Sequence, residues 1–268
     1  MPYPRKRIFI NCPFDKEYRK ILNPLLFTIL YSGFEPAISE TKSSSDIRIN
    51  QIKKIIKDSD YSIHDLSRCR QKKLSDPPRF NMPFELGLDI GCLEYGNNKQ
   101  RMKKILILEK EKFFYQKFLS DIAGQDIRNH NNKPIEVIEI IRDWFSTLFE
   151  KKKFDGPDII WNYYNDFTDS LIKRLEKEGY KKDRVLKLPF TEYIGYARKW
   201  IKEKRKVNQL KHRNEYGKEE HCRQLFSDIM EVGSNPGNIH FIGSIIFIHE
   251  GVYTSSEVRQ LVVIVING

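Results

Sequence analysis

The sequence lacks the features that define several common classes of protein. Its four cysteines form no CxxC pair and show no spacing typical of metal ligands, so we expect reduced thiols and no bound metal. No segment reaches the roughly 18 uninterrupted apolar residues of a membrane-spanning helix. The basic amino terminus also lacks the apolar run of a signal peptide. These absences predict a cytoplasmic protein that is not inserted in a membrane.

Most familiar catalytic motifs are missing too. The chain has no glycine-rich phosphate loop, and its six histidines show neither an HExxH motif nor a paired spacing. No Ser-His-Asp arrangement stands out, and there is no internal repeat or low-complexity tract. His64 lies in an apolar stretch, where we expect it to pack beside the core or donate a hydrogen bond to the backbone. The chemistry must therefore rest on few groups.

The chain is rich in positive charge and in apolar residues. Its formal net charge of +11 favours attraction to polyanions, which include nucleic acid, anionic lipid and phosphorylated small molecules. A hydrophobic content of 40% over 268 residues suffices for one large domain, or for one domain and a smaller one. The most basic stretch, residues 198–213, is interpreted either as a solvated helix face or as a surface that contacts nucleic acid.

Alternating strand and helix patterns predict an α/β fold with a doubly wound, mostly parallel sheet. The expected strands are residues 7–11, 34–39, 61–66 and 104–108, and the expected helices are residues 16–32, 46–58 and 134–149. In such a fold the carboxyl ends of the strands share one edge of the sheet, because the crossovers have a single hand. Ligands bind at that edge.

A change of composition near residue 150 predicts a domain boundary. Three lysines at 151–153 and the Gly-Pro pair at 156–157 follow the last predicted helix of the sheet domain. We therefore expect a nucleotide-binding domain over residues 1–150. Residues 151–268 are expected to form a mainly helical, basic region with short terminal strands at 240–248 and 260–266.

The stretch DPPRFNMPFELGLDIGCLEYG, residues 76–96, carries the strongest functional signal. Its prolines keep the chain extended up to Pro83, after which an apolar helix is expected to begin. Glu85 then falls in the first helical turn, near the positive end of the helix dipole, which favours its ionised form. The alternative is that Glu85 is an ordinary first-turn acid.

The same helix carries two glycines on its apolar side. Phe84, Leu88 and Gly91 fall on one face at helical spacing, and Gly87 joins them. A glycine inside a helix costs roughly 1 kcal/mol relative to alanine. We therefore expect that another backbone, or a ligand, approaches this helix closely.

Polar and aromatic residues gather where the predicted strands end. Asn11 and Phe14 follow the first strand, Asp65 and Ser67 follow the third, and Glu85 opens the next helix on the same side. This convergence predicts a ligand site with Glu85 as its carboxylate. The structural alternatives are a turn-capping role for Asp65 and a core position for Phe14.

Two further residues precede the helix and are included in the substrate-binding set. The guanidinium fork of Arg79 suits a diphosphate, although Arg79 is also compatible with a surface charge. Asn81 is either a substrate contact or a turn residue that hydrogen-bonds its own backbone.

A single carboxylate suits the cleavage of an N-glycosidic bond whose leaving group is already cationic. Nicotinamide leaves the ribose of NAD without needing a proton, so the enzyme must only stabilise the developing ribosyl cation. A neutral nucleobase would need a proton donor as it leaves, and Asp65 is the residue that could supply it.

Three segments resemble known families: IFINCPFD, YSIHDLS and PRFNMPFELGLDIG. They resemble the TIR-like nucleotide-binding domains of bacterial anti-phage effectors, and the ELG block is also similar to nucleoside 2-deoxyribosyltransferases. The resemblance covers roughly residues 6–145. It implies a TIR/flavodoxin-like fold, hydrolysis of NAD to nicotinamide and ADP-ribose, Glu85 as the catalytic residue, and a loop after the first strand that lines the nicotinamide pocket near Phe14. Two departures are Phe80, where the effectors usually carry aspartate, and the region after residue 150, which matches no sensor domain.

The leading hypothesis is therefore a TIR-like NAD hydrolase of bacterial anti-phage defence that acts as a homo-oligomer, with NAD as its substrate and no other cofactor. One alternative is a nucleoside or nucleotide N-glycosidase or deoxyribosyltransferase. The other is a non-enzymatic module that senses a nucleotide and contacts nucleic acid through residues 198–213.

Overall fold

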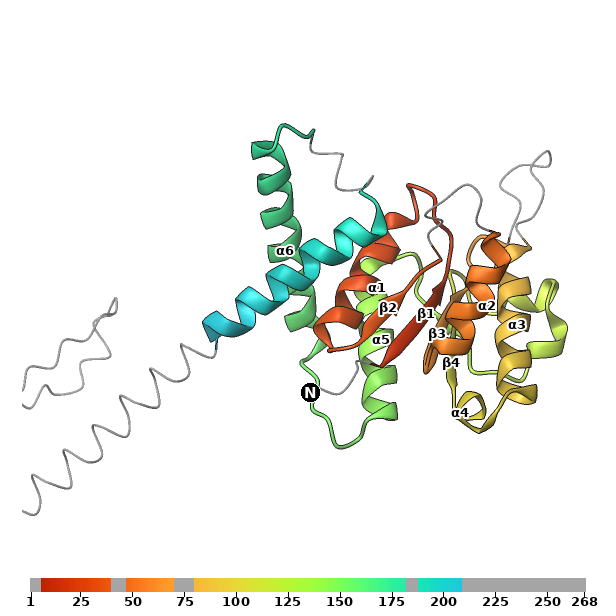
Figure 1. Ribbon diagram of the computed structural model, residues 1–268. Helices are drawn as coiled ribbons and strands as arrows, with labels where there is room; N and C mark the ends of the chain where they lie inside the picture. The colour runs from red at the N-terminus through yellow and green to blue at the C-terminus, as the bar shows by residue number, and fades with distance from the viewer. Residues whose placement is uncertain (1–5, 40–46, 70–79, 182–187, 209–268) are drawn as a thin grey trace, which may run out of the picture. The chain divides into compact units, whose positions relative to one another are not determined.

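The computed structural model describes residues 6–39, 47–69, 80–181 and 188–208 (Figure 1). The chain divides into two compact units, Met1–Arg205 and Lys206–Gly268. The described elements lie in the first unit, apart from residues 206–208 at the end of its last helix. The predicted strands at 240–248 and 260–266 fall outside the described residues.

The first unit contains a five-stranded, entirely parallel sheet in the order β2-β1-β3-β4-β5. The strands are β1 (Arg7–Asn11), β2 (Glu35–Ala37), β3 (Tyr61–Asp65), β4 (Lys104–Glu109) and β5 (Arg128–Asn129). The three central strands, β1, β3 and β4, are mostly buried because helices cover both faces of a parallel sheet. The predicted doubly wound α/β fold is confirmed.

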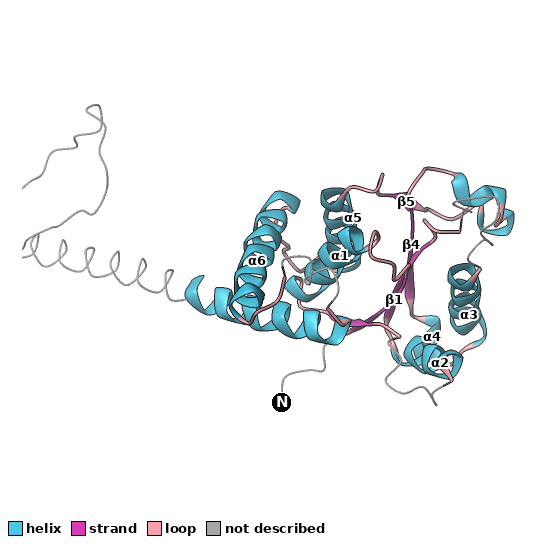
Figure 2. Ribbon diagram, turned by 90° about the horizontal axis from the view of Figure 1, so that it is seen from above, coloured by secondary structure: helices cyan, strands magenta, loops and turns pink. Residues whose placement is uncertain are grey.

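Helices cover both faces of the sheet (Figure 2). They are α1 (Arg19–Tyr31), α2 (Arg48–Asp58), α3 (Asn81–Tyr95), α4 (Asn98–Arg101), α5 (Pro134–Leu148) and α6 (Pro157–Lys177), with 3-10 turns η1 (Phe114–Lys117) and η2 (Ser120–Ile122) and a last helix at 190–208. Helices α1, α5 and α6 lie on one side, and α2, α3 and α4 lie on the other. The strand order reverses between β1 and β3, which defines the point where such folds bind ligands.

Helix α1 is buried on every side rather than along one stripe. Eleven of its thirteen residues are buried, because it lies between the sheet and two later helices. Phe27 of α1 stacks on Phe167 of α6 with ring centroids 5.4 Å apart. The hydroxyl of Tyr193, in the helix at 190–208, donates to the Asn23 carbonyl oxygen over 3.2 Å. The sequence predicted a boundary near residue 150; in the structure the helices beyond it share the core, and the compact unit extends to Arg205.

Helix α3 begins earlier than the sequence predicted. It starts at Asn81, and Pro83 sits in its first turn, where a missing backbone N–H costs nothing. Glu85 therefore lies in the second turn, and the prediction of a first-turn position was wrong. The buried face is Met82, Glu85, Leu86 and Asp89. The predicted apolar face is divided, since Phe84 is 57% exposed whereas Leu88 is partly buried and packs against the cluster of Phe9, Ile52 and Ile56.

Among the described residues, no other backbone lies close to Gly87 or Gly91 of α3. A Cβ built at Gly87 or Gly91 would meet nothing within 4 Å. We expect Gly87→Ala to raise the free energy of unfolding by about 0.5–1 kcal/mol, because alanine loses less backbone entropy in a helix. Denaturant unfolding measures this.

Gly96→Ala is the matched control, since its Cβ would lie 2.2 Å from the Cys92 carbonyl oxygen and should destabilise the protein. A loss of stability in Gly87→Ala would contradict the open outer face of α3.

No helix among the described residues combines the length and the apolar character needed to cross a bilayer.

Candidate active site

The carboxyl ends of β1 and β3 are joined to α3 by one side chain. The Nδ2 group of Asn11 donates to the Met82 carbonyl oxygen over 2.8 Å and lies 2.9 Å from Nδ1 of His64. An amide nitrogen has two hydrogens, so both are engaged inside the protein. Asn11 is buried. Its side chain holds the start of α3 against the ends of β1 and β3, and it has no N–H left to donate to a ligand.

Glu85 lies above this junction, on the buried face of α3. The residue is only 6% exposed. Its Oε1 atom is 3.8 Å from Nη2 of Arg48, the first residue of α2, whose side chain is 46% exposed. That separation is an ion pair without a close hydrogen bond. Burial raises the pKa of the Glu85 carboxyl and the Arg48 charge only partly opposes this. Among the described residues, the Glu85 anion is therefore poorly compensated.

Arg48 also links Glu85 to the loop after β1. Its guanidinium carbon lies 5.6 Å from the centroid of the Phe14 ring. Phe14 and Glu85, both predicted site residues, are thus brought to the same arginine. Arg48 itself was missed, because on sequence alone it is one of many basic residues at the start of a helix.

Asp65 is the centre of a second, fully buried cluster at the end of β3. Its carboxylate accepts hydrogen bonds from the Tyr18 hydroxyl, from the Ser67 backbone N–H over 2.7 Å and from Nε2 of His130 over 2.9 Å. Burial alone would raise the pKa of Asp65, but the nearby His130 ring and these hydrogen bonds outweigh burial and leave the pKa below its usual value. Asp65 is therefore an ionised acceptor at neutral pH and not a proton donor.

Ser67, His130 and Asp65 do not form a nucleophilic triad. The backbone N–H of Asn132 donates to Nδ1 of His130 over 3.1 Å, which leaves the ring proton on Nε2. That same Nε2 faces both Asp65 and, at 3.0 Å, the Ser67 hydroxyl. A catalytic triad needs the carboxylate and the serine on opposite ring nitrogens, so Ser67 has no general base here.

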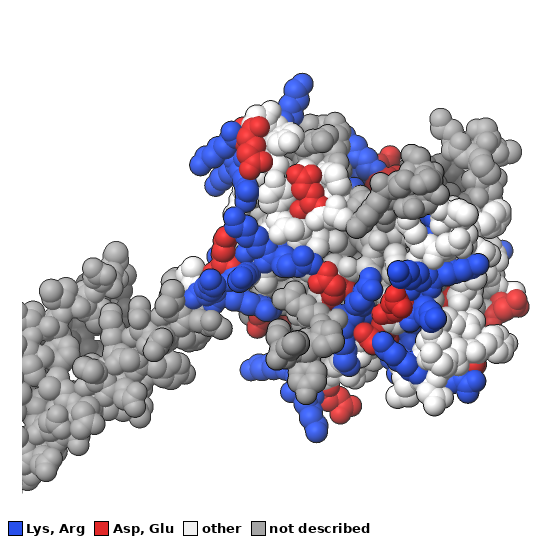
Figure 3. Space-filling view, viewed as in Figure 1, with Lys and Arg blue, Asp and Glu red and all other residues white. Residues whose placement is uncertain are grey.

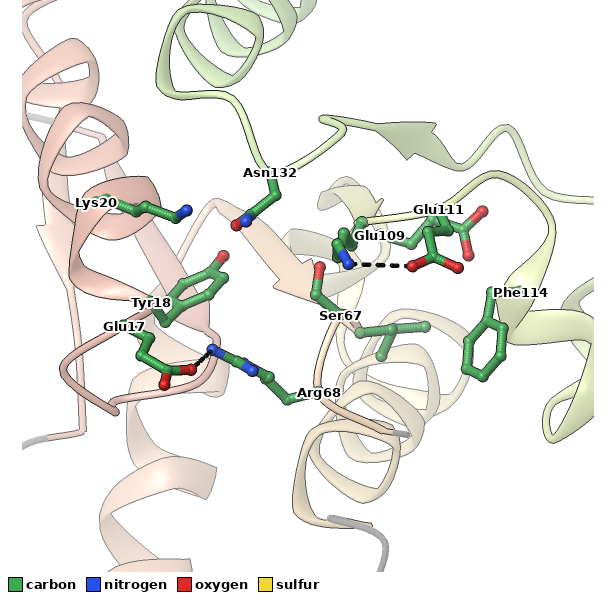
Figure 4. A pocket seen from close by; sticks show the side chains of 11 residues that line it. Glu17, Tyr18, Lys20, Ser67, Arg68, Glu109, Glu111, Phe114 and Asn132 are labelled. Carbon is green, nitrogen blue, oxygen red and sulfur yellow. Dashed lines mark hydrogen bonds and ion pairs between the residues drawn. The ribbon is translucent and has the colours of Figure 1, made fainter. Parts of the chain in front are cut away.

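A cavity of about 760 Å³ opens beside this cluster, as Figure 4 shows. Its walls come from the start of α1, the loop after β3 and the end of β4, and its lining residues are Glu17, Tyr18, Lys20, Leu66, Ser67, Arg68, Glu109, Lys110, Glu111, Phe114 and Asn132. Its size is typical of small-ligand sites. The walls carry lysine, arginine and glutamate together, so the cavity suits a polar ligand.

The cavity and Glu85 flank the same strand end, although Glu85 is not among the lining residues. Cys12, the residue after β1, feels the charges of both Asp65, beside the cavity, and Glu85. Burial raises the pKa of its thiol, and the Asp65 and Glu85 carboxylates raise it further. Both carboxylates are therefore close enough to Cys12 to disfavour its thiolate.

The remaining predicted site residues are placed as follows. Asn81 is the first residue of α3 and is exposed, whereas Arg79 lies outside the described residues. Within the described ranges, no group of three or more His, Cys, Asp and Glu side chains could hold a metal ion.

A buried polar network holds α3 at Asp89, one turn after Glu85. Nε2 of His64 donates to Oδ2 of Asp89 over 2.8 Å, and Nζ of Lys103 donates to Oδ1 of Asp89 over 2.5 Å and to the Ile56 carbonyl oxygen over 2.7 Å. Burial lowers the pKa of His64 despite the adjacent Asp89 carboxylate, so His64 is neutral. The predicted core position of His64 is correct, but its partner is a side chain rather than the backbone.

The described part of the basic stretch makes several contacts within the chain. Arg198 pairs with Glu35 over 2.6 Å, Lys204 pairs with Asp166 over 3.3 Å, and Arg205 donates to the Tyr31 carbonyl oxygen. Figure 3 shows Lys and Arg side chains along this helix interleaved with acidic ones. These pairs reduce the positive charge available to nucleic acid. Residues 209–213 lie outside the described residues.

No protein-family model matches the chain, and a search of curated proteins finds no significant match.

Proposed function

We propose that the protein hydrolyses the nicotinamide N-glycosidic bond of NAD, with Glu85 as the catalytic carboxylate. The observation that supports this most directly is the position of Glu85. It is a buried, poorly compensated anion at the strand reversal of a doubly wound sheet. Such an anion gains most when a cation develops next to it.

The reaction needs little more than this carboxylate. The bond between the ribose anomeric carbon and the nicotinamide nitrogen breaks, and its electron pair goes to the pyridinium ring, which becomes neutral. Glu85 stabilises the ribosyl cation that remains. Water adds to that carbon and loses one proton to solvent, so that NAD and water yield nicotinamide, ADP-ribose and a proton.

The Asp65 cluster favours NAD over substrates with a neutral leaving base. A neutral nucleobase requires protonation as it leaves. Asp65, the predicted donor for that step, is held ionised by three hydrogen bonds. The nucleoside N-glycosidase or deoxyribosyltransferase alternative therefore lacks the acid that the sequence offered it.

The biological setting rests on the family resemblance alone. We propose a cytoplasmic effector of bacterial anti-phage defence that acts as a homo-oligomer, as TIR-like enzymes do. The cavity beside Asp65 would hold the nucleotide portion of the substrate, with Ser67 at its wall.

Incubation of concentrated, self-associated protein with NAD tests the proposal, with nicotinamide and ADP-ribose separated by chromatography. We expect both products in equal amounts. Release of free base from deoxynucleosides with NAD left intact would instead select the deoxyribosyltransferase alternative. Nucleotide binding without turnover, or DNA binding that weakens steeply with salt, would select the non-enzymatic one.

The pH dependence of kcat/KM for NAD should report the ionisation of Glu85. Only the ionised carboxylate can stabilise a cation, so kcat/KM should rise with pH. Because burial raises the pKa of Glu85 above its ordinary 4.5, the midpoint of this rise should lie above 4.5. Arg48→Gln should move the midpoint further upward, since Arg48 lowers the pKa. A midpoint at or below 4.5 would contradict the role of Glu85.

A further inference from the structure

Arg48 is placed where the proposed reaction cannot tolerate a fixed cation. Its Nη2 atom is 3.8 Å from the Glu85 carboxylate, which is where the ribosyl cation must develop. Two like charges at this carboxylate would repel each other. For Glu85 to serve the transition state, Arg48 must give up its contact with Glu85 when substrate arrives.

The structure leaves Arg48 free to do so. Its side chain is 46% exposed, and the pair with Glu85 is too long for a close hydrogen bond. Because the Arg48 side chain is half exposed, water can solvate its charge when the contact breaks, so the loss costs less than in a fully buried pair. The guanidinium also lies over the face of Phe14, which keeps it beside the site.

We propose that Arg48 is a specificity-determining residue that exchanges the Glu85 carboxylate for the diphosphate of the substrate. This inference rests on the proposed function. The guanidinium fork matches two phosphate oxygens, and such charge-assisted bonds are about twice as strong as neutral ones. The substrate then replaces the ion pair with two new ones, because its ribosyl cation faces Glu85 and its diphosphate faces Arg48. The site thereby binds nucleotides that carry a diphosphate more tightly than the corresponding nucleosides.

Binding of ADP and of adenosine tests this without any reaction. Titration calorimetry compares the wild-type protein, Arg48→Gln and Arg174→Gln. Arg174 is the matched control, because its side chain is 47% exposed and pairs with Glu178 over 3.0 Å on α6, on the opposite side of the sheet. We expect the wild type and Arg174→Gln to prefer ADP. Arg48→Gln should weaken ADP binding about 10- to 100-fold and leave adenosine within about 2-fold.

Kinetics add a second readout. For NAD, Arg48→Gln should raise KM more than it lowers kcat, whereas turnover of nicotinamide riboside, which has no phosphate, should not fall. Arg48→Lys should recover part of the ADP affinity, because it restores the charge without the fork.

Three outcomes overturn the inference: a wild type that does not prefer ADP to adenosine, equal ADP affinity in wild type and Arg48→Gln, or an equal loss of ADP and adenosine. These are separable from failure of the proposed function. If NAD is not cleaved but the ADP preference disappears in Arg48→Gln, the phosphate role of Arg48 stands and the hydrolase proposal falls.

Discussion

Glu85→Gln is expected to slow nicotinamide release from NAD by about 10²- to 10³-fold, the usual effect of removing one preorganised electrostatic group. Glutamine has the same shape as glutamate but carries no charge, so it cannot stabilise the ribosyl cation. The loss should appear in kcat and not in KM, because the interaction forms only in the transition state. Chromatographic measurement of nicotinamide over time checks this.

The fold should survive this substitution. Within the part of the chain that the structure describes, Glu85 makes one long ion pair with a half-exposed arginine, so removing its charge leaves no buried cation there. Glu94→Gln, on the exposed side of the same helix, is the control and should keep full activity. Equal nicotinamide release by wild type and Glu85→Gln would remove Glu85 from the mechanism.

Asp89→Ala is expected to lower the free energy of unfolding by about 3–5 kcal/mol, as is usual when one partner of a buried ion pair is removed. The side chains of Asp89 and Lys103 are 0% and 1% exposed, and the substitution would leave the Lys103 ammonium with the Ile56 carbonyl oxygen as its described partner. The His64 N–H would also lose its acceptor. Urea unfolding measures the change.

Asp126→Ala tests whether the stability lost in Asp89→Ala comes from the burial of the ion pair or from ion pairing alone. Asp126 pairs with Arg128 over 2.7 Å, but both side chains are mostly exposed, so this substitution should cost at most about 1 kcal/mol. Adding Lys103→Met to Asp89→Ala should restore part of the lost stability, because it removes the uncompensated charge. Equal, small losses for Asp89→Ala and Asp126→Ala would show that the network does not anchor α3.

The strands and most helices could be predicted from the sequence because short apolar runs alternate with amphipathic ones. The segment KILIL predicted β4, and the observed strand runs from Lys104 to Glu109. The parallel topology alone predicted that one edge of the sheet would bring together Asn11, Phe14, Asp65 and Ser67. The position of Glu85 next to this edge followed from the same reasoning.

The details of α3 could not be predicted because its buried face is not apolar. Two acids four residues apart, Glu85 and Asp89, point inward, while Phe84 points outward. Periodicity rules expect the reverse. Asp89 can be buried because Lys103, fourteen residues later and just before β4, and His64 of β3 both pair with its carboxylate. Partners of this kind come from tertiary structure and leave no local pattern. The same is true of His130, which follows β5 and reaches Asp65 at the end of β3.

The burial of α1 on all sides determines how much of the chain is needed for independent folding. A fragment that ends at residue 150 would retain the sheet. It would lose the packing of α6 on Phe27 and the hydrogen bond from the Tyr193 hydroxyl to the Asn23 carbonyl oxygen. The bared apolar side of α1 would then face water, where it would promote aggregation. Truncated forms of the protein should therefore keep the chain through Arg205.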